Sequence, residues 1–121
     1  MSKTMRLVGW AVAVALAIAV APPASAALTE DSCDSERFCV WNPDGRKLSL
    51  SNGAYDLNET AGGVLNDAIS WATNNSGYTW CLYADAGYRG DYRIYASGYD
   101  GDTDEFGWQV SSLRAEPWYG C

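Results

Sequence analysis

The stretch that most constrains the fold of this chain is residues 80–90. Strand-forming residues run into a turn, with Tyr83 before it, Tyr88 five residues later and Gly90 two residues after that. Glycine adopts positive φ at low cost, so a turn with this spacing predicts a β-hairpin that folds back over itself.

A weaker copy of this pattern lies 42 residues upstream. Residues 38–41 align with residues 80–83, which matches Trp41 with Tyr83. Further along, residues 69–71 align with residues 110–112 at an offset of 41. Internal repetition at this period predicts two related units of roughly forty residues.

The first residues are typical of a secretory signal peptide. Lys3 and Arg6 give a positive start, residues 7–20 are apolar, and Ala24 and Ala26 supply a small-residue cleavage site. We therefore predict that residues 1–26 are a leader and that the mature protein is secreted and extracellular. The alternative is a membrane anchor, but the apolar run falls short of the ~20 residues that a span needs. The remaining residues, 27–121, suit a single domain.

The chain is strongly acidic, with fifteen acidic and eight basic residues, two of the basic ones in the leader. This charge makes nucleic acid an improbable partner and disfavours anionic membranes. It is compatible with a cation or with a basic patch on a protein. Acidity can also serve solubility alone.

Four cysteines in an exported chain favour two disulfides over thiolate metal chemistry. Three pairings are possible. We favour Cys33 with Cys39, which are close in sequence, and Cys81 with Cys121, which would tie the last residue to a central strand.

The rest of the chain indicates an almost wholly β domain. Strand patterns cover residues 38–41, 47–51, 66–72, 78–83, 91–95 and 109–114. Residues 98–105 are predicted to form a long acidic loop. Outside the predicted leader there are eight tyrosines and five tryptophans, and most of them are expected to fill the space between two sheets.

Tyr83, Tyr88 and Gly90, with Ser111 late in the same unit, resemble the Greek-key signature of the βγ-crystallins. In that family the two aromatics pack over the folded hairpin, the glycine permits its backbone, and the serine ties it down. The resemblance implies an all-β fold of two Greek keys, about 37–75 and 79–117, packed as a small βγ-crystallin-like sandwich with two disulfides.

The first unit matches this signature less well. It keeps Trp41, but Arg46 stands in place of the second aromatic and Leu48 in place of the glycine. The first hairpin is therefore expected to be shorter or open. The Cys-x5-Cys opening, the Cys-x-Trp start, the Asn-Asp-x-x-Ser segment and the final cysteine together resemble the secreted actinobacterial branch of peptidase inhibitor family I36, which includes a metalloproteinase inhibitor.

The βγ-crystallin resemblance also implies a single calcium site. Its motif has two Asn or Asp residues, two of any kind, then Ser or Thr and Ser, and Asn66, Asp67 and Ser70 fit it. Oxygens of this kind are the ligands that calcium prefers. Trp71 replaces the final serine, and in the second unit Gly107 and Trp108 replace the acidic pair. Alternatively, Asp67 and Ser70 only hydrogen-bond a tight turn. No other cofactor is expected.

Catalysis is not expected. The chain has no histidine, which excludes Ser/His and Cys/His nucleophile pairs and histidine zinc sites. Asp85 and Asp91 could in principle act as a glycosidase pair, but paired acids arise by chance in so acidic a chain. Residues 100–104 resemble the start of an EF-hand, yet the glycine and glutamate that its loop requires are missing.

The I36 resemblance implies inhibition of a secreted peptidase or binding to a peptidase-like subunit. Residues 42–47 and 98–105 are the candidate loops for entering an active-site cleft. The alternative is a non-catalytic binding module, either calcium-binding and crystallin-like or an adaptor in a secreted protein or toxin complex. A secreted antimicrobial toxin on the same fold is a third hypothesis, by fold analogy alone.

Overall fold

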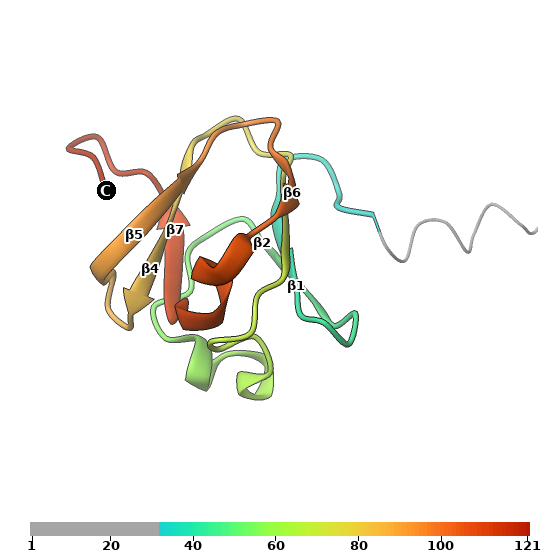
Figure 1. Cartoon of the computed structure of the whole chain (residues 1–121). Helices are drawn as coiled ribbons and strands as arrows, with labels where there is room; N and C mark the ends of the chain where they lie inside the picture. The colour runs from blue at the N-terminus through green and yellow to red at the C-terminus, as the bar shows by residue number, and fades with distance from the viewer. Residues whose placement is uncertain (1–31) are drawn as a thin grey trace, which may run out of the picture. The chain divides into compact units, whose positions relative to one another are not determined.

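Two antiparallel β-sheets form the body of the protein (Figure 1). The computed structural model describes residues 32–121, so the predicted signal peptide lies outside the described residues. The first sheet has the strand order β2 (Lys47–Leu50), β1 (Phe38–Trp41), β3 (Trp71–Asn74), β6 (Asp100–Asp102). The second has the order β5 (Arg89–Tyr95), β4 (Trp80–Asp85), β7 (Ser112–Ala115). The all-β prediction is confirmed.

Short 3-10 helices connect the strands. They are η3 (Leu57–Glu59), η4 (Ala61–Gly63) and η5 (Asp104–Gln109). No helix within residues 32–121 has the length and apolar content that a membrane span requires.

The two repeats exchange backbone pairing between the sheets. β6, from the second repeat, pairs with β3 of the first. In return, Ala54 of the first repeat bridges Leu113 in β7, with its amide donating to the Leu113 carbonyl at 2.8 Å. Each sheet therefore contains backbone from both halves of the chain.

This exchange corrects two sequence expectations. The acidic loop predicted for residues 98–105 contains strand β6, because backbone pairing to a neighbour overrides the low strand propensity of Asp and Gly. The strand predicted for residues 66–72 begins only at Trp71. The residues before it form a turn, with Asp67 at a φ of 55°.

The core lies between the two sheets, where equivalent residues of the repeats meet. Phe38 stacks on Trp80, its counterpart at the offset of 42, with ring centroids 4.6 Å apart and planes 10° apart. Both rings are buried. The other large apolar and aromatic residues buried around them are Val40, Leu57, Leu65, Ile69, Leu82, Tyr95, Phe106, Val110 and Leu113.

The two disulfides are the predicted ones, Cys33–Cys39 and Cys81–Cys121. The first ties the segment before β1 to that strand. The second ties the end of the chain to β4, the central strand of the second sheet.

Candidate functional site

The hairpin between β4 and β5 folds back as its sequence predicts. Tyr83 is buried, and its ring lies 5.8 Å from that of Tyr88 and 6.1 Å from that of Tyr92. Gly90 has a φ of 84°, and a Cβ there would lie 2.7 Å from the Asp85 carboxylate. Only glycine fits this position without strain. Burial raises the pKa of the Tyr88 hydroxyl.

Ser112 is the serine that ties this hairpin down. Its hydroxyl donates to the Asp85 carbonyl at 2.6 Å and accepts from the Tyr88 amide at 3.0 Å. The resemblance assigned this role to Ser111, one residue too early. Successive side chains of a strand point to opposite faces, so a shift of one residue reverses the direction of the hydroxyl. Ser111 instead donates to the Asp67 carboxylate at 3.3 Å.

In the hairpin between β1 and β2, the Asn42 side chain holds the loop closed. The Oδ1 atom of Asn42 accepts from the amides of Asp44 (3.0 Å) and Arg46 (2.9 Å), and its Nδ2 donates to the Val64 carbonyl (3.2 Å). The Asn42 amide donates to the Arg46 carbonyl at 3.0 Å, and the Gly45 amide to the Asn42 carbonyl at 2.9 Å. Gly45 takes a φ of 86°, which the turn requires, and residues 42–46 form a short loop held by these hydrogen bonds.

This loop, together with Lys47, is named the Asn42 hairpin here. Asn42 itself is buried, whereas residues 43–47 are exposed. In Figure 1 the hairpin projects from the sheets beyond the ends of β1 and β2. It is therefore both protruding and internally fixed.

The second candidate loop, residues 98–105, is held more closely to the body. The Asp100 carboxylate accepts from Trp71 Nε1 at 3.0 Å and from the Thr73 hydroxyl at 2.6 Å. These hydrogen bonds, that from Thr73 first, lower the pKa of Asp100. With β6 also paired to β3, this segment lies along the sheet edge and does not project as the Asn42 hairpin does.

The calcium candidates lie at the turn before β3. Asn66 Oδ1 is buried without a hydrogen-bond partner, and the exposed Asp67 carboxylate accepts from Ser111. The hydroxyl of Ser70 donates to the Trp41 carbonyl at 3.2 Å. The structure thus brings Asp67 next to a serine of the other repeat.

An unpartnered amide oxygen and a carboxylate are among the ligands that a hard cation prefers, although Asn66 faces the Asp67 carboxylate with its Nδ2, at 3.5 Å, and not with its Oδ1. Asn66 and Asp67 would hold calcium, with Ser70 or Ser111 supplying a hydroxyl oxygen. Among residues 32–121, no group of three or more acidic, cysteine or histidine residues could hold a metal. Backbone or solvent oxygens would have to complete the ligand set.

The equivalent position in the second repeat is closed to side chains. A Cβ on Gly107 would lie 1.8 Å from the Ile69 carbonyl oxygen. The Gly107 carbonyl in turn accepts from the Ile69 amide at 3.0 Å. The acidic residue that the motif expects cannot occupy this close backbone contact.

Residues 26–95 match the family model of peptidase inhibitor family I36. The chain belongs to this family. No curated protein matches it.

Solved structures with similar folds identify the fold of this I36 protein as that of the βγ-crystallins, as Tyr83, Tyr88 and Gly90 indicated. A βγ-crystallin from Ciona intestinalis has a TM-score of 0.56 and 24% identity, covering 66% of this chain and 99% of that one. A βγ-crystallin domain from Flavobacterium johnsoniae has a TM-score of 0.52 and 31% identity, covering 64% and 90%. The N-terminal domain of protein S has a TM-score of 0.53 and 27% identity, covering 64% and 92%.

Sequence reasoning missed two residues that shape this I36 protein. The sequence placed Asn42 only within the candidate loop 42–47, although an asparagine at the first position of a loop often accepts hydrogen bonds from amides further along. Ser112 was missed because two serines adjoin, and only the register of β7 with β4 distinguishes them.

Proposed function

We propose that this I36 protein is a secreted, non-catalytic inhibitor of an extracellular peptidase, and that the Asn42 hairpin enters the active-site cleft of that peptidase. Family membership supports the class of function. The observation that carries the choice of element is the Asn42 side chain, which bonds three backbone groups from inside the loop.

An inhibitory loop must keep its shape in solution and on the enzyme. A loop ordered before docking loses less conformational entropy when it binds, so its contacts contribute more to affinity. The exposed tip presents Asp44, Arg46 and Lys47, with Pro43 fixing φ at its start. The hydrogen bonds of Asn42 would also hold the strand ends together around any strained or cut peptide bond.

The test measures hydrolysis by a panel of thermolysin-like and trypsin-like peptidases with micromolar mature protein. We expect at least one peptidase to be slowed while the protein stays intact on a gel. Asn42→Ala should weaken that inhibition about tenfold or more, because it frees the loop. Asn52→Ala, at an exposed asparagine outside the hairpin, is the matched control and should inhibit normally. Absence of inhibition across the panel would reject the proposal.

A second candidate function is calcium binding, which the unpartnered Asn66 oxygen favours. A bound ion stabilises the folded state by mass action, so the melting temperature should rise with added calcium and fall with a chelator. Asp67→Ala should abolish the response, and Asp34→Ala, at an exposed aspartate elsewhere, should keep it. A response unchanged in Asp67→Ala would discard this ligand assignment.

A further inference from the structure

Trp118 is the most exposed large apolar side chain among the described residues, at 96%. It sits in a turn, residues 117–120, that is closed by the Gly120 amide donating to the Pro117 carbonyl at 2.9 Å. We name this turn the Trp118 knob.

The knob is fixed to the second sheet through Cys121. Cys121 follows it directly and is bonded to Cys81 in β4. The Cys121 carbonyl accepts from the buried Tyr83 hydroxyl at 3.2 Å. The exposed indole is therefore displayed on an anchored turn.

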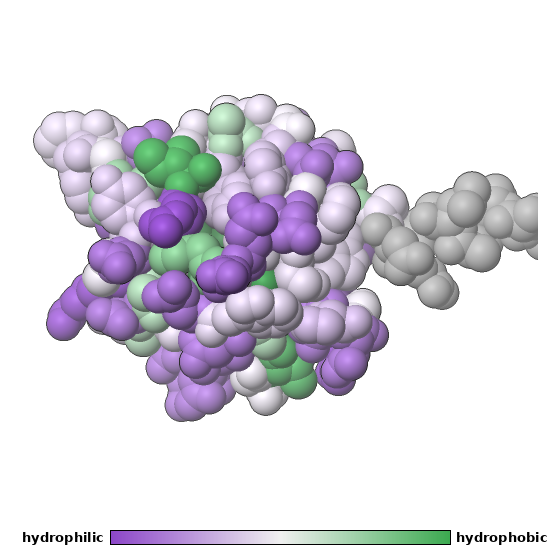
Figure 2. Space-filling model, viewed as in Figure 1, coloured by the Kyte–Doolittle hydropathy of each residue, from purple (hydrophilic) through white to green (hydrophobic). Residues whose placement is uncertain are grey.

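Two other exposed apolar side chains, Tyr92 and Ile94, lie on the outer face of β5, and a third, Tyr119, lies in the knob itself. Tyr119 is 63% exposed, Ile94 52% and Tyr92 45%. Ile94 is the register partner of Cys81, which places it beside the disulfide. Arg114 lies under Tyr119, with its guanidinium carbon 5.9 Å from the ring centroid. Figure 2 shows a strongly hydrophobic spot near the upper end of β5 on a surface that is otherwise mostly hydrophilic.

Tryptophan, tyrosine and arginine are the residue types most enriched at protein interfaces and their energetic centres. We propose that the Trp118 knob docks into an apolar pocket of a partner protein, with Tyr92, Ile94 and Tyr119 forming the surrounding contact surface. Arg114 lies under Tyr119 and the exposed Glu116 adjoins the knob, so the rim of that pocket is expected to carry an acidic group facing Arg114 and a basic group facing Glu116.

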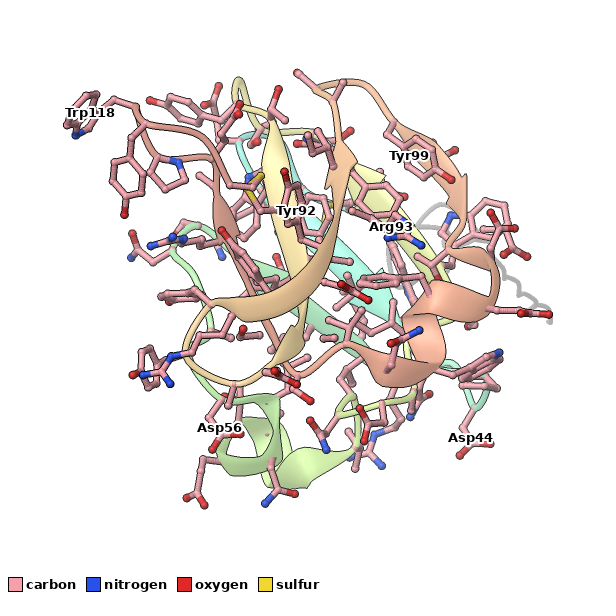
Figure 3. All side chains as sticks on the ribbon, turned by 60° about the vertical axis from the view of Figure 1, so that its left-hand side comes forward. Asp44, Asp56, Tyr92, Arg93, Tyr99 and Trp118 are labelled. Atoms are coloured by element: carbon pink, nitrogen blue, oxygen red, sulfur yellow. A yellow bond between two sulfur atoms is a disulfide. The ribbon has the colours of Figure 1, made fainter. Side chains whose placement is uncertain are left out.

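This surface is distinct from the proposed inhibitory one. In Figure 3 the labelled Trp118 and Asp44 lie at opposite ends of the molecule, and in Figure 1 the end of the chain is likewise far from the Asn42 hairpin. Both ends are therefore able to bind at once, and the protein would link a peptidase to a second protein.

The geometry favours a protein pocket over other ligands. The rings of Trp118 and Tyr119 are perpendicular, at 90°, so they form no flat platform for stacking a sugar chain. A net charge of −7 repels anionic lipid surfaces and other copies of the same chain. A projecting indole fits a concave partner instead.

The test places the photocrosslinker p-benzoylphenylalanine at position 118 of the full secreted protein and, as control, at position 108, where Trp108 is 49% exposed. The probe is the secreted protein fraction of the source organism's culture medium. We expect one crosslinked protein specific to position 118. That protein, once purified, should bind wild type and Trp108→Ala equally, and Trp118→Ala at least about tenfold more weakly. All variants should keep the wild-type melting temperature.

Several results would overturn the proposal. The first two are the absence of a crosslinked product specific to position 118, and equal affinity of the partner for Trp118→Ala and wild type. The other two are self-association through the knob in sedimentation, and Trp118-dependent binding to phosphatidylcholine vesicles or to insoluble polysaccharide. Peptidase inhibition is scored separately. Trp118→Ala should inhibit as wild type does, and Asn42→Ala should still bind the partner, so either function can fail alone. Loss of inhibition in Trp118→Ala would show that the two surfaces are not independent.

Discussion

Gly107 should be the least replaceable glycine of the protein, for a steric reason. It does not have a positive φ, so its backbone conformation is open to any residue. A Cβ there would nevertheless lie 1.8 Å from the Ile69 carbonyl oxygen and 2.3 Å from the Thr103 hydroxyl. Neither neighbour has room to yield, because Ile69 and Thr103 are both buried.

The magnitude follows from the hydrogen bonds that alanine would break. The Ile69 amide donates to the Gly107 carbonyl at 3.0 Å, and the Thr103 hydroxyl donates to the Ile69 carbonyl at 2.7 Å. Each bond contributes about 1 kcal/mol, and each buried group left unpaired costs about 1–3 kcal/mol. With both bonds lost (about 2 kcal/mol) and one buried group left unpaired after relaxation (about 1–3 kcal/mol), Gly107→Ala should lower the free energy of unfolding by about 3–5 kcal/mol.

Gly45→Ala is the matched control. Gly45 has a φ of 86° and no atom within 4 Å of its would-be Cβ, so alanine costs only the backbone term of about 1–2 kcal/mol. Urea unfolding followed by tryptophan fluorescence gives both values from the midpoint and slope. A loss in Gly107→Ala no larger than in Gly45→Ala would refute the close-contact explanation.

Three further predictions concern stability. Ser112→Ala should cost about 2–3 kcal/mol, and Ser111→Ala less than about 1, in urea unfolding. Replacing both cysteines of Cys81–Cys121 with serine should cost about 4 kcal/mol, against about 2.4 for Cys33–Cys39, because the closed loop is longer. Burial raises the pKa of Tyr95 to about 12 from 10.0, so the folded state holds this proton more tightly and stability should fall between pH 10 and 12; Tyr95→Phe should flatten that fall.

Features set by local pattern could be predicted from the sequence. The spacing of Tyr83, Tyr88 and Gly90 specified a folded hairpin because each residue acts within that hairpin. The repeat offset matched Phe38 with Trp80, and these two rings stack at the centre of the core. The pairing of Cys33 with Cys39 was predicted from their short separation in the sequence. The pairing of Cys81 with Cys121 was predicted because the strand that carries Cys81 was expected to be central.

Features set by pairing between the two halves of the chain could not be predicted from the sequence. Strand β6 contains Asp100, Gly101 and Asp102, none of which favours a strand, and it exists only because β3 lies beside it. The contact of Asp67 with Ser111 joins residues 44 positions apart. Such contacts depend on how the sheets are placed, which no local pattern encodes.

The two predicted repeats have equivalent backbone bonds but present different surfaces at the two ends of the protein. The Ser70 amide donates to the Trp41 carbonyl, and the Ser111 amide to the Tyr83 carbonyl, both at 2.8 Å, so the repeats share one backbone frame. Within that frame, the second hairpin folds back over Tyr83 and is bonded by Ser112, which leaves its sheet able to anchor the segment that carries Trp118.

The first hairpin has no second aromatic to fold over, because Arg46 stands in that place. Two backbone hydrogen bonds close its loop, and the buried Asn42 side chain adds two more by accepting from the Asp44 and Arg46 amides. The tip is consequently turned outward and ordered at the same time. A loop with both properties suits the insertion into a peptidase cleft that is proposed above, because an ordered loop loses less conformational entropy on docking.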